Sequence, residues 1–122
     1  TKQNMSRPQH HSFATIPVEH LNPLFDRQFV TGERSMLARL VLRKGCMVPL
    51  HSHHNEQISY VLQGALRFII QGEEIIVRTG EVLVIPPHAP HSAEALEDTV
   101  AIDIFCPPRT DWIDGTDAYL RK

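Results

Sequence analysis

The sequence predicts an all-β fold, a sandwich or a barrel, built as a single domain. Short apolar segments recur about every ten residues between turn signals, as they do in such folds. No long segment keeps the 3.6-residue period of an amphipathic helix. The chain has 122 residues and is 42% hydrophobic, which suits one domain with one core.

Each expected strand is a short apolar stretch that ends at glycine, proline or a polar turn. In chain order they are residues 35–43, 58–62, 66–70, 74–78, 82–85, 91–96 and 99–105. Gln71–Gly72–Glu73 separates two of them and is typical of a hairpin turn. A helical turn or two is expected only within residues 109–120. Residues 21–29 fit either kind of structure.

Charge and composition argue against several classes of partner. The formal net charge is −2 and no basic patch is present, so nucleic acid is not an expected partner. The longest apolar runs, such as residues 82–87, are too short to cross a membrane, and no secretory signal is visible. We therefore expect a soluble, cytoplasmic protein. Residues 1–14 are expected to form a flexible N-terminal arm, and residues 15–122 the single domain.

The two cysteines, Cys46 and Cys106, are too few for a disulfide framework. Both are interpreted as small apolar filler residues, because free cysteine is usually buried and behaves as a small hydrophobe. No redox role is assigned to either thiol.

Four side chains of the central region could bind one metal ion. His51 and His53 are two residues apart, so on a strand they share a face, and Gln57 has the same parity if the bend between them preserves it. His91 begins a later strand, which a barrel can bring opposite the others. Three imidazole nitrogens and one oxygen suit Zn, Fe, Ni, Mn or Co rather than Ca or Mg. Glu56 stays an alternative fourth ligand, although its parity places it on the other face.

The spacing of these residues resembles the two sequence motifs of the cupin superfamily. The first motif is matched by Gly45, His51, His53, Gln57 and Gly64, with glutamine where the motif has glutamate. The second is matched by Gly80, Pro86 and His91, while His88 and Ala95 replace its glycine and asparagine. The resemblance covers residues 35–105 and implies a jelly-roll barrel, often a homodimer, with one divalent metal ion in its mouth. The neutral glutamine would leave the ion its full charge, which favours Lewis-acid chemistry.

An aspartate also stands in a strand that should be buried. Asp103 lies between two isoleucines and shares a face with Phe105, and burying a carboxylate is costly unless it is paired or functional. One interpretation is a structural ion pair between Asp103 and Arg109. The other is an acid/base group beside an anion anchor, because arginine binds carboxylates through two hydrogen bonds. Trp112 is expected to pack at the barrel end or against a second subunit.

The histidine segments and this tail together resemble the small pectin-degradation cupins of the KdgF type. That family opens the ring of 4,5-unsaturated monouronates left by polysaccharide lyases on pectin and alginate. The resemblance implies an isomerase-type enzyme with Asp103 as base, Phe105 against the sugar and Arg109 on the carboxylate of a small sugar substrate. Two alternatives stay open: a dioxygenase or lyase on the same scaffold, and a non-catalytic cupin that binds a sugar or another effector.

Overall fold

The computed structural model describes residues 7–121, in which a series of strands precedes two short helices. The strands are β1 (Glu19–Asn22), β2 (Phe25–Thr31), β3 (Met36–Leu42), β4 (Met47–His51), β5 (Glu56–Gln63), β6 (Ala65–Ile70), β7 (Glu73–Arg78), β8 (Val82–Ile85), β9 (His91–Ala95) and β10 (Thr99–Cys106). The helices are α2 (Thr110–Asp114) and the 3₁₀ helix η1 (Ala118–Leu120). The seven predicted strands correspond to β3 and to β5 through β10, and the expected helical turns are α2 and η1.

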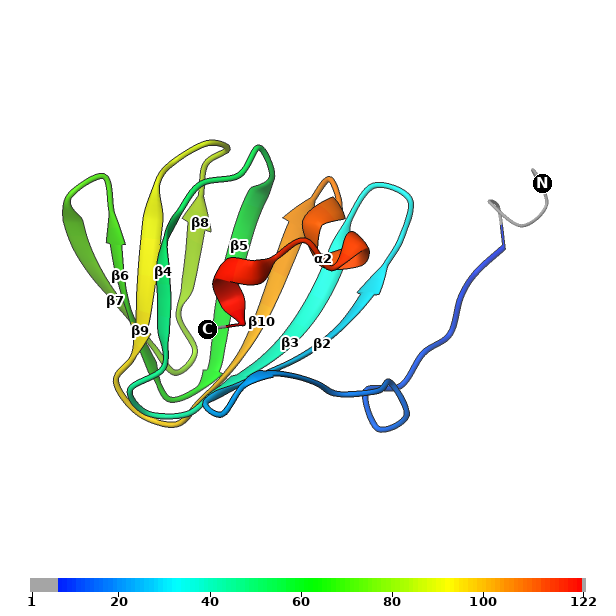
Figure 1. Ribbon diagram of the computed structural model, residues 1–122, viewed down its shortest axis with the longest axis horizontal. Helices are drawn as coiled ribbons and strands as arrows, with labels where there is room; N and C mark the ends of the chain where they lie inside the picture. The colour runs from blue at the N-terminus through cyan, green and yellow to red at the C-terminus, as the bar shows by residue number, and fades with distance from the viewer. Residues whose placement is uncertain (1–6, 122) are drawn as a thin grey trace.

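Two antiparallel sheets form the jelly-roll barrel that the sequence predicted (Figure 1). One sheet has the strand order β1-β2-β3-β10-β5-β8, and the other has the order β4-β9-β6-β7. Three strands were not among the predicted ones: β1 and β2, which overlap the ambiguous residues 21–29, and β4, which ends at the first histidine of the motif. Strands β4 and β5 follow each other in the chain but thus lie in different sheets, and the site residues they carry meet inside the barrel.

Alternation along the strands decides which side chains face the interior. In β3 every second residue is buried, and in β10 the buried set is Thr99, Ala101, Asp103 and Phe105. Because successive side chains point to opposite faces of a sheet, the alternation that buries Phe105 also carries the Asp103 carboxylate inward. The same alternation leaves Cys106 exposed, so its prediction as a buried filler is wrong, while Cys46 is buried as expected.

Gly64 shows why the first motif ends in glycine. Its φ is +102°, a conformation that residues with a side chain rarely adopt. A Cβ at this position would lie 2.5 Å from the Asp98 carbonyl oxygen and from Thr99 Oγ1, so any side chain would displace the start of β10. The close approach of the β5–β6 turn to the start of β10 therefore requires glycine.

The N-terminal segment is only partly described. Residues 1–6 of the predicted flexible arm lie outside the described residues, and the flexibility of the arm stays a prediction. Farther along, the buried side chain of Gln28 donates hydrogen bonds of 2.7 Å to the carbonyl oxygens of Phe13 and Ile16, which attaches this segment to the barrel. Within residues 7–121, no helix has the length and apolarity needed to span a membrane.

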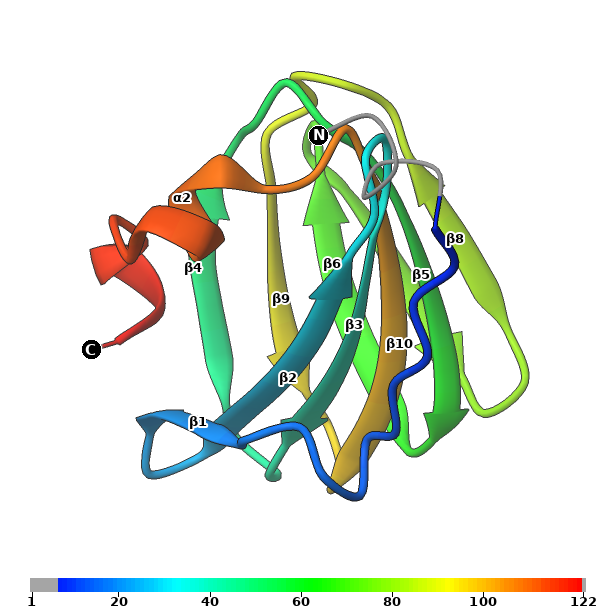
Figure 2. The ribbon, with the colours of Figure 1, turned by 90° about the vertical axis from the view of Figure 1, so that its right-hand side faces the viewer.

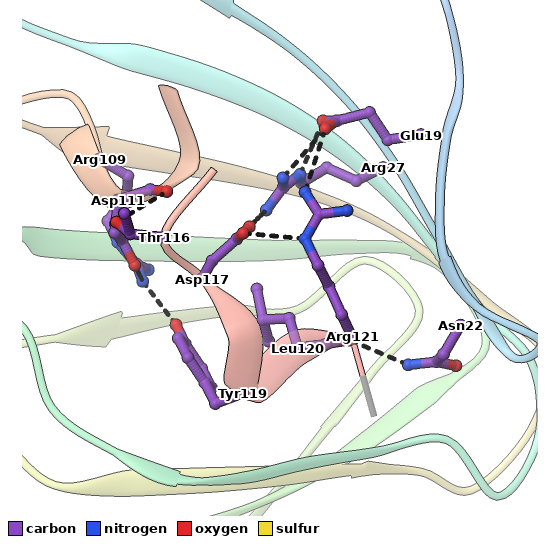
Figure 3. Close-up of polar contacts among 10 residues, drawn as sticks. All are labelled: Glu19, Asn22, Arg27, Arg109, Asp111, Thr116, Asp117, Tyr119, Leu120 and Arg121. Carbon is purple, nitrogen blue, oxygen red and sulfur yellow. Dashed lines mark hydrogen bonds and ion pairs between the residues drawn. The ribbon is translucent and has the colours of Figure 1, made fainter. Parts of the chain in front are cut away.

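The C-terminal segment, residues 107–121, lies beside β4 at one side of the barrel (Figure 2). A buried ion pair anchors it: Arg27 Nη1 lies 2.6 Å from Asp117 Oδ2, and both side chains are fully buried. Arg121 Nε also donates a hydrogen bond to Asp117 Oδ1, and Arg27 Nε donates one to Glu19 Oε1 (Figure 3). Burial alone would raise the pKa of Asp117, but hydrogen bonds from Arg27 and Arg121 hold it below its usual value.

Candidate metal centre

Three histidines converge at one end of the barrel interior. His51 is the last residue of β4 and pairs in register with His91, the first residue of β9. His53 lies in the bend between β4 and β5, so this bend, and not strand alternation as the sequence suggested, directs its ring. Each of the three rings offers one nitrogen, and these nitrogens lie within 4.8 Å of one another.

The Nδ1 atom of each of the three rings faces a backbone carbonyl oxygen. Each Nδ1 lies near a backbone carbonyl oxygen: that of His51 at 2.8 Å from Pro49, that of His53 at 3.1 Å from Asn55, and that of His91 at 2.8 Å from Ala89. A carbonyl oxygen only accepts, so Nδ1 carries the hydrogen and Nε2 keeps its lone pair. Burial lowers the pKa of His51 and His53 to about 4, and that of His91 below its usual value. The three rings are thus neutral at pH 7, the form that binds metal.

Gln57 points its amide oxygen toward the histidine group. It is buried in β5 while Glu56 before it is exposed, as the parity predicted. Its Nε2 donates to Ser59 Oγ and Asp103 Oδ2, both at 3.1 Å, which fixes the orientation of the amide. Its Oε1 then lies 3.0 Å from His53 Nε2, and with the hydrogen of that ring assigned to Nδ1 these two atoms face each other through lone pairs. Two lone pairs that face each other at this distance fit a shared cation. The three histidines therefore fit a divalent transition metal, and Gln57 as the fourth ligand stays a prediction.

The predicted site residues surround one pocket next to the histidines. Its walls include Gln57, Asp103, Phe105 and Arg109, together with His51 and His91. Trp112 and Tyr119 of the C-terminal segment complete the wall, and core residues such as Phe25, Leu40 and Phe68 form its apolar part. The fold thus brings the predicted site residues together from four strands, β4, β5, β9 and β10, and from the C-terminal segment.

Asp103 keeps one carboxylate oxygen uncommitted inside this pocket. The residue is 5% exposed, and Oδ2 accepts the hydrogen bond from Gln57. Oδ1 is buried without a hydrogen-bond partner among the described residues. Burial raises the pKa of Asp103 to about 6, and the polar groups of Ser59 and Gln57 beside it only partly oppose this shift. The group is therefore ionised at neutral pH and is a stronger base than an exposed aspartate.

Arg109 forms its ion pair with Asp111, which contradicts the interpretation of a structural pair with Asp103. Nε and Nη2 each donate to Asp111 at 2.9 Å, and Nη2 also donates to Tyr119 Oη at 2.6 Å (Figure 3). The reason is local, because the first turn of α2 places Asp111 beside Arg109. Burial alone would lower the pKa of Arg109, but Asp111 and Tyr119 raise it above its usual value, so the positive charge is retained.

Sequence reasoning missed three polar residues of the site: Asn55, Asp111 and Tyr119. Asn55 is 2% exposed and donates to the carbonyl oxygens of Pro107 and Pro108, which ties the His53 bend to the segment that carries Arg109. Its position inside the first motif was the only available signal. Tyr119 reaches the pocket through a long-range contact that the sequence does not reveal.

The expected packing of Trp112 is confirmed. Its ring centroid lies 4.9 Å from that of Phe105, and 5% of the residue is exposed. The guanidinium carbons of Arg27 and Arg109 lie 4.3 and 4.9 Å from its ring centre, within the range of cation–π contacts. The indole therefore connects the anchor of the C-terminal segment with the pocket wall.

The barrel and its histidine group are those of a cupin, and residues 38–106 match the Cupin domain family. The chain belongs to the cupin family. It is 31% identical over 100 residues to the pectin degradation protein KdgF of Dickeya dadantii strain 3937, which covers 80% of this chain and 91% of that protein. The structure of KdgF from Halomonas sp. matches with a TM-score of 0.81 and 28% identity, over 87% of this chain and 99% of that one. Within the cupins, the chain therefore groups with the KdgF-type proteins.

A more distant relative is 3-hydroxyanthranilate 3,4-dioxygenase of Rattus norvegicus. It is 30% identical over 74 residues, which is 57% of this chain and 26% of that enzyme. This similarity is confined to part of the barrel and supports the same family.

Proposed function

We propose that the protein is a metal-dependent isomerase that opens the ring of 4,5-unsaturated monouronates from pectin and alginate breakdown. The observation that carries this proposal is Asp103, a buried carboxylate with a free oxygen and a pKa of about 6, in one pocket with the histidine group and Arg109. The similarity to the KdgF proteins supports the substrate class.

The reaction needs one base and no redox step. The substrate is a cyclic hemiacetal whose ring oxygen is also part of an enol ether. Asp103 takes the proton of the anomeric hydroxyl group, the carbonyl forms at the anomeric carbon, and the bond to the ring oxygen breaks. The ring oxygen keeps the electron pair as an enolate on carbon 5. Asp103 then returns the proton to carbon 4, the other carbon of the former double bond, which gives an open-chain keto aldehyde. A divalent metal held by the histidines would supply Lewis-acid stabilisation of negative charge on substrate oxygens.

The surroundings of Arg109 and Phe105 support a role for both in holding the sugar. The Nη1 group of Arg109 has no hydrogen bond within residues 7–121, so it is free to donate to the substrate carboxylate. Phe105 is 1% exposed and packs against both His53 and the Arg109 guanidinium, with the pocket on its free side. Arginine retains its charge in such a partly apolar wall and still makes directed hydrogen bonds to an anion.

The test is turnover of a defined unsaturated monouronate by metal-loaded protein. The ultraviolet absorbance of the enol ether should fall faster than in protein-free solution, and NMR should show the keto aldehyde as product. Asp103→Asn protein, shown to be folded and metal-loaded, is the control and should act far more slowly. Folded, metal-loaded wild type that leaves the absorbance unchanged would contradict the proposal.

The similarity to the rat dioxygenase favours one alternative activity, oxidation of a small molecule by O₂. That chemistry needs a redox-active metal, normally Fe(II), whereas ring opening needs only a Lewis acid. If protein loaded with Zn(II) still acts on the uronate and takes up no oxygen, the activity is ring opening and not oxidation. Activity that appears only with Fe(II) and O₂ would favour the dioxygenase.

We also propose that the protein is a homodimer that associates through the outer face of β5, β8 and β10. The large apolar residues exposed there are Tyr60, Leu62, Val82, Val84 and Ile104, and cross-strand pairs such as Tyr60–Val82 make the patch continuous. A two-fold dimer can bury one such patch on each copy against the same patch of the other. Light scattering should give a dimer mass, and Val84→Lys with Ile104→Lys should give a monomer that still binds metal.

A further inference from the structure

Tyr119 covers the histidine group from the C-terminal segment. It lies in η1, and its ring centroid is 4.8 Å from that of His51, with a tilt of 36° between the rings. The same side chain lines the pocket together with Asp103 and Arg109. A ligand that enters the pocket beside the histidines therefore meets the Tyr119 ring.

The hydroxyl group of Tyr119 has a free hydrogen-bond donor. Its oxygen accepts the 2.6 Å hydrogen bond from Arg109 Nη2. A phenol carries one hydrogen of its own, and that hydrogen has no acceptor among the described residues. A hydroxyl that accepts from a guanidinium is also polarised toward donating. Tyr119 Oη–H and Arg109 Nη1–H are thus two neighbouring donors at the pocket, each without an acceptor within residues 7–121.

The position of Tyr119 is fixed before any ligand arrives. The buried Arg27–Asp117 pair holds the residue two positions before it. The carbonyl oxygen of Leu120, directly after it, accepts a 3.0 Å hydrogen bond from Asn22 Nδ2 (Figure 3). Binding therefore need not order this side chain, and preorganised donors retain more of their interaction energy on binding.

We propose that Tyr119 determines specificity for acidic sugars: its hydroxyl and the Arg109 guanidinium form a two-donor clamp for the substrate carboxylate. The clamp rests on the proposed function only for the identity of the sugar. The carboxylate accepts from both donors and lies between the C-terminal segment and the histidine group. A neutral sugar has no carboxylate for these two donors, so it lacks the ionic part of the interaction.

Trp112 provides a binding signal that does not depend on turnover. It is the only tryptophan of the chain, and it contacts Arg109 in the pocket wall. Tryptophan fluorescence of metal-loaded protein can therefore be titrated with D-galacturonate, which has no enol ether to react, and with D-galactose, which lacks the carboxylate. Wild type should bind galacturonate more tightly than galactose.

The test variant is Tyr119→Phe, which keeps the ring over His51 and removes only the hydroxyl. A hydrogen bond to a charged group is worth about 1.5–3 kcal/mol, so Kd for galacturonate should rise roughly ten- to a hundredfold. Kd for galactose and the metal content should stay unchanged. The matched control is Tyr60→Phe, at the only other tyrosine, which lies in the patch of the proposed dimer on the outer face of β5, away from the pocket, and should leave both constants as in wild type.

A second measurement keeps the test valid if Tyr119→Phe does not fold. In the Tyr60→Phe protein Tyr119 is the only tyrosine, so ultraviolet resonance Raman spectra report its hydrogen bonding alone. The phenol bands should change when galacturonate is added and stay constant with galactose. Unchanged bands with bound galacturonate would overturn the clamp.

Three other results would overturn the proposal: equal Kd for galacturonate in wild type and Tyr119→Phe, an equal loss for both sugars, or no binding of galacturonate by wild type. Failure of ring opening is a separate outcome. If galacturonate binding depends on Tyr119 while unsaturated uronates are not turned over, the clamp stands and the proposed reaction is wrong.

Discussion

Asp103 and Asp117 are both buried aspartates, and their surroundings are opposite. Asp117 is fully buried, bonds to Arg27 and Arg121, and has a pKa below its usual value. Asp103 is 5% exposed, accepts one side-chain hydrogen bond from Gln57, keeps Oδ1 without a partner, and has a pKa raised to about 6. Burial opposes ionisation in both, so the presence or absence of a paired cation makes the difference.

This difference separates a carboxylate that holds the fold from one that is available for chemistry. A carboxylate that is fully buried and paired with two arginines is not accessible to a substrate and has a low affinity for protons. An unpaired one destabilises the fold but retains the basicity that proton transfer requires. Burial of charge by itself therefore does not distinguish a structural carboxylate from a functional one, and the proposal of Asp103 as base also uses the lack of a paired cation.

The largest effect is expected from breaking the paired aspartate. Asp117→Asn leaves the Arg27 charge buried beside a neutral group, and the free energy of unfolding should fall by about 3–5 kcal/mol. Denaturant unfolding of the metal-free protein measures this. The control is Glu19→Gln, which removes the partly exposed partner of the same arginine and should cost less than about 1 kcal/mol. Equal stability of Asp117→Asn and wild type would show that the pair does not anchor the C-terminal segment.

Replacement of Asp103, the unpaired aspartate, should lower the rate of turnover without lowering the stability of the fold. Asp103→Asn should lower kcat on an unsaturated monouronate by roughly a hundredfold or more, because the general base is lost. Its unfolding free energy should equal or exceed that of wild type, since a buried charge without a counter-ion is removed. Turnover assays on the metal-loaded protein measure the first effect, and denaturant unfolding of the metal-free protein measures the second. Undiminished turnover would refute the assignment of Asp103 as base.

Acid should reduce the difference in the free energy of unfolding between wild type and Asp117→Asn. Because the folded pKa of Asp117 lies below its unfolded value of 3.8, its contribution is present above pH 3.8 and is lost as pH falls through the folded pKa. The stability difference between the two proteins should therefore be constant near neutral pH and shrink below pH 3.8. Denaturation at a series of pH values measures it, and a difference that grows in acid would mean that Asp117 is not the stabilising anion.

The smallest effect is expected at the fourth ligand. Gln57→Glu should keep or tighten metal binding by a few-fold, because a carboxylate adds charge to an oxygen ligand already in place. Glu56→Ala, one residue away and exposed, should leave metal content unchanged. Competition with a chelator gives both affinities. Loss of metal in Glu56→Ala but not in Gln57→Ala would reverse the assignment.

The sequence predicted those parts of the site that depend on local spacing. The histidines, the inward direction of Gln57 and the inward direction of Asp103 all follow from motif spacing and strand alternation. The partners of Arg109 were missed for a physical reason. Asp111 is brought to it by a single turn of helix, and Tyr119 by an anchor that depends on a buried contact with β2. Contacts made by tertiary packing leave no periodic signal in the chain.

Trp112 links the two regions that these aspartates represent. One indole ring contacts both the Arg27 guanidinium, which belongs to the structural pair, and the Arg109 guanidinium, which lines the pocket beside the histidines. The energies of the two regions are therefore not expected to be additive, because a shift of the ring on one side changes its contact on the other. If Arg109 binds an anion as proposed, a substitution that only loosens the C-terminal anchor should also weaken that binding, and selection for a stable fold and for ligand affinity would act on the same side chain.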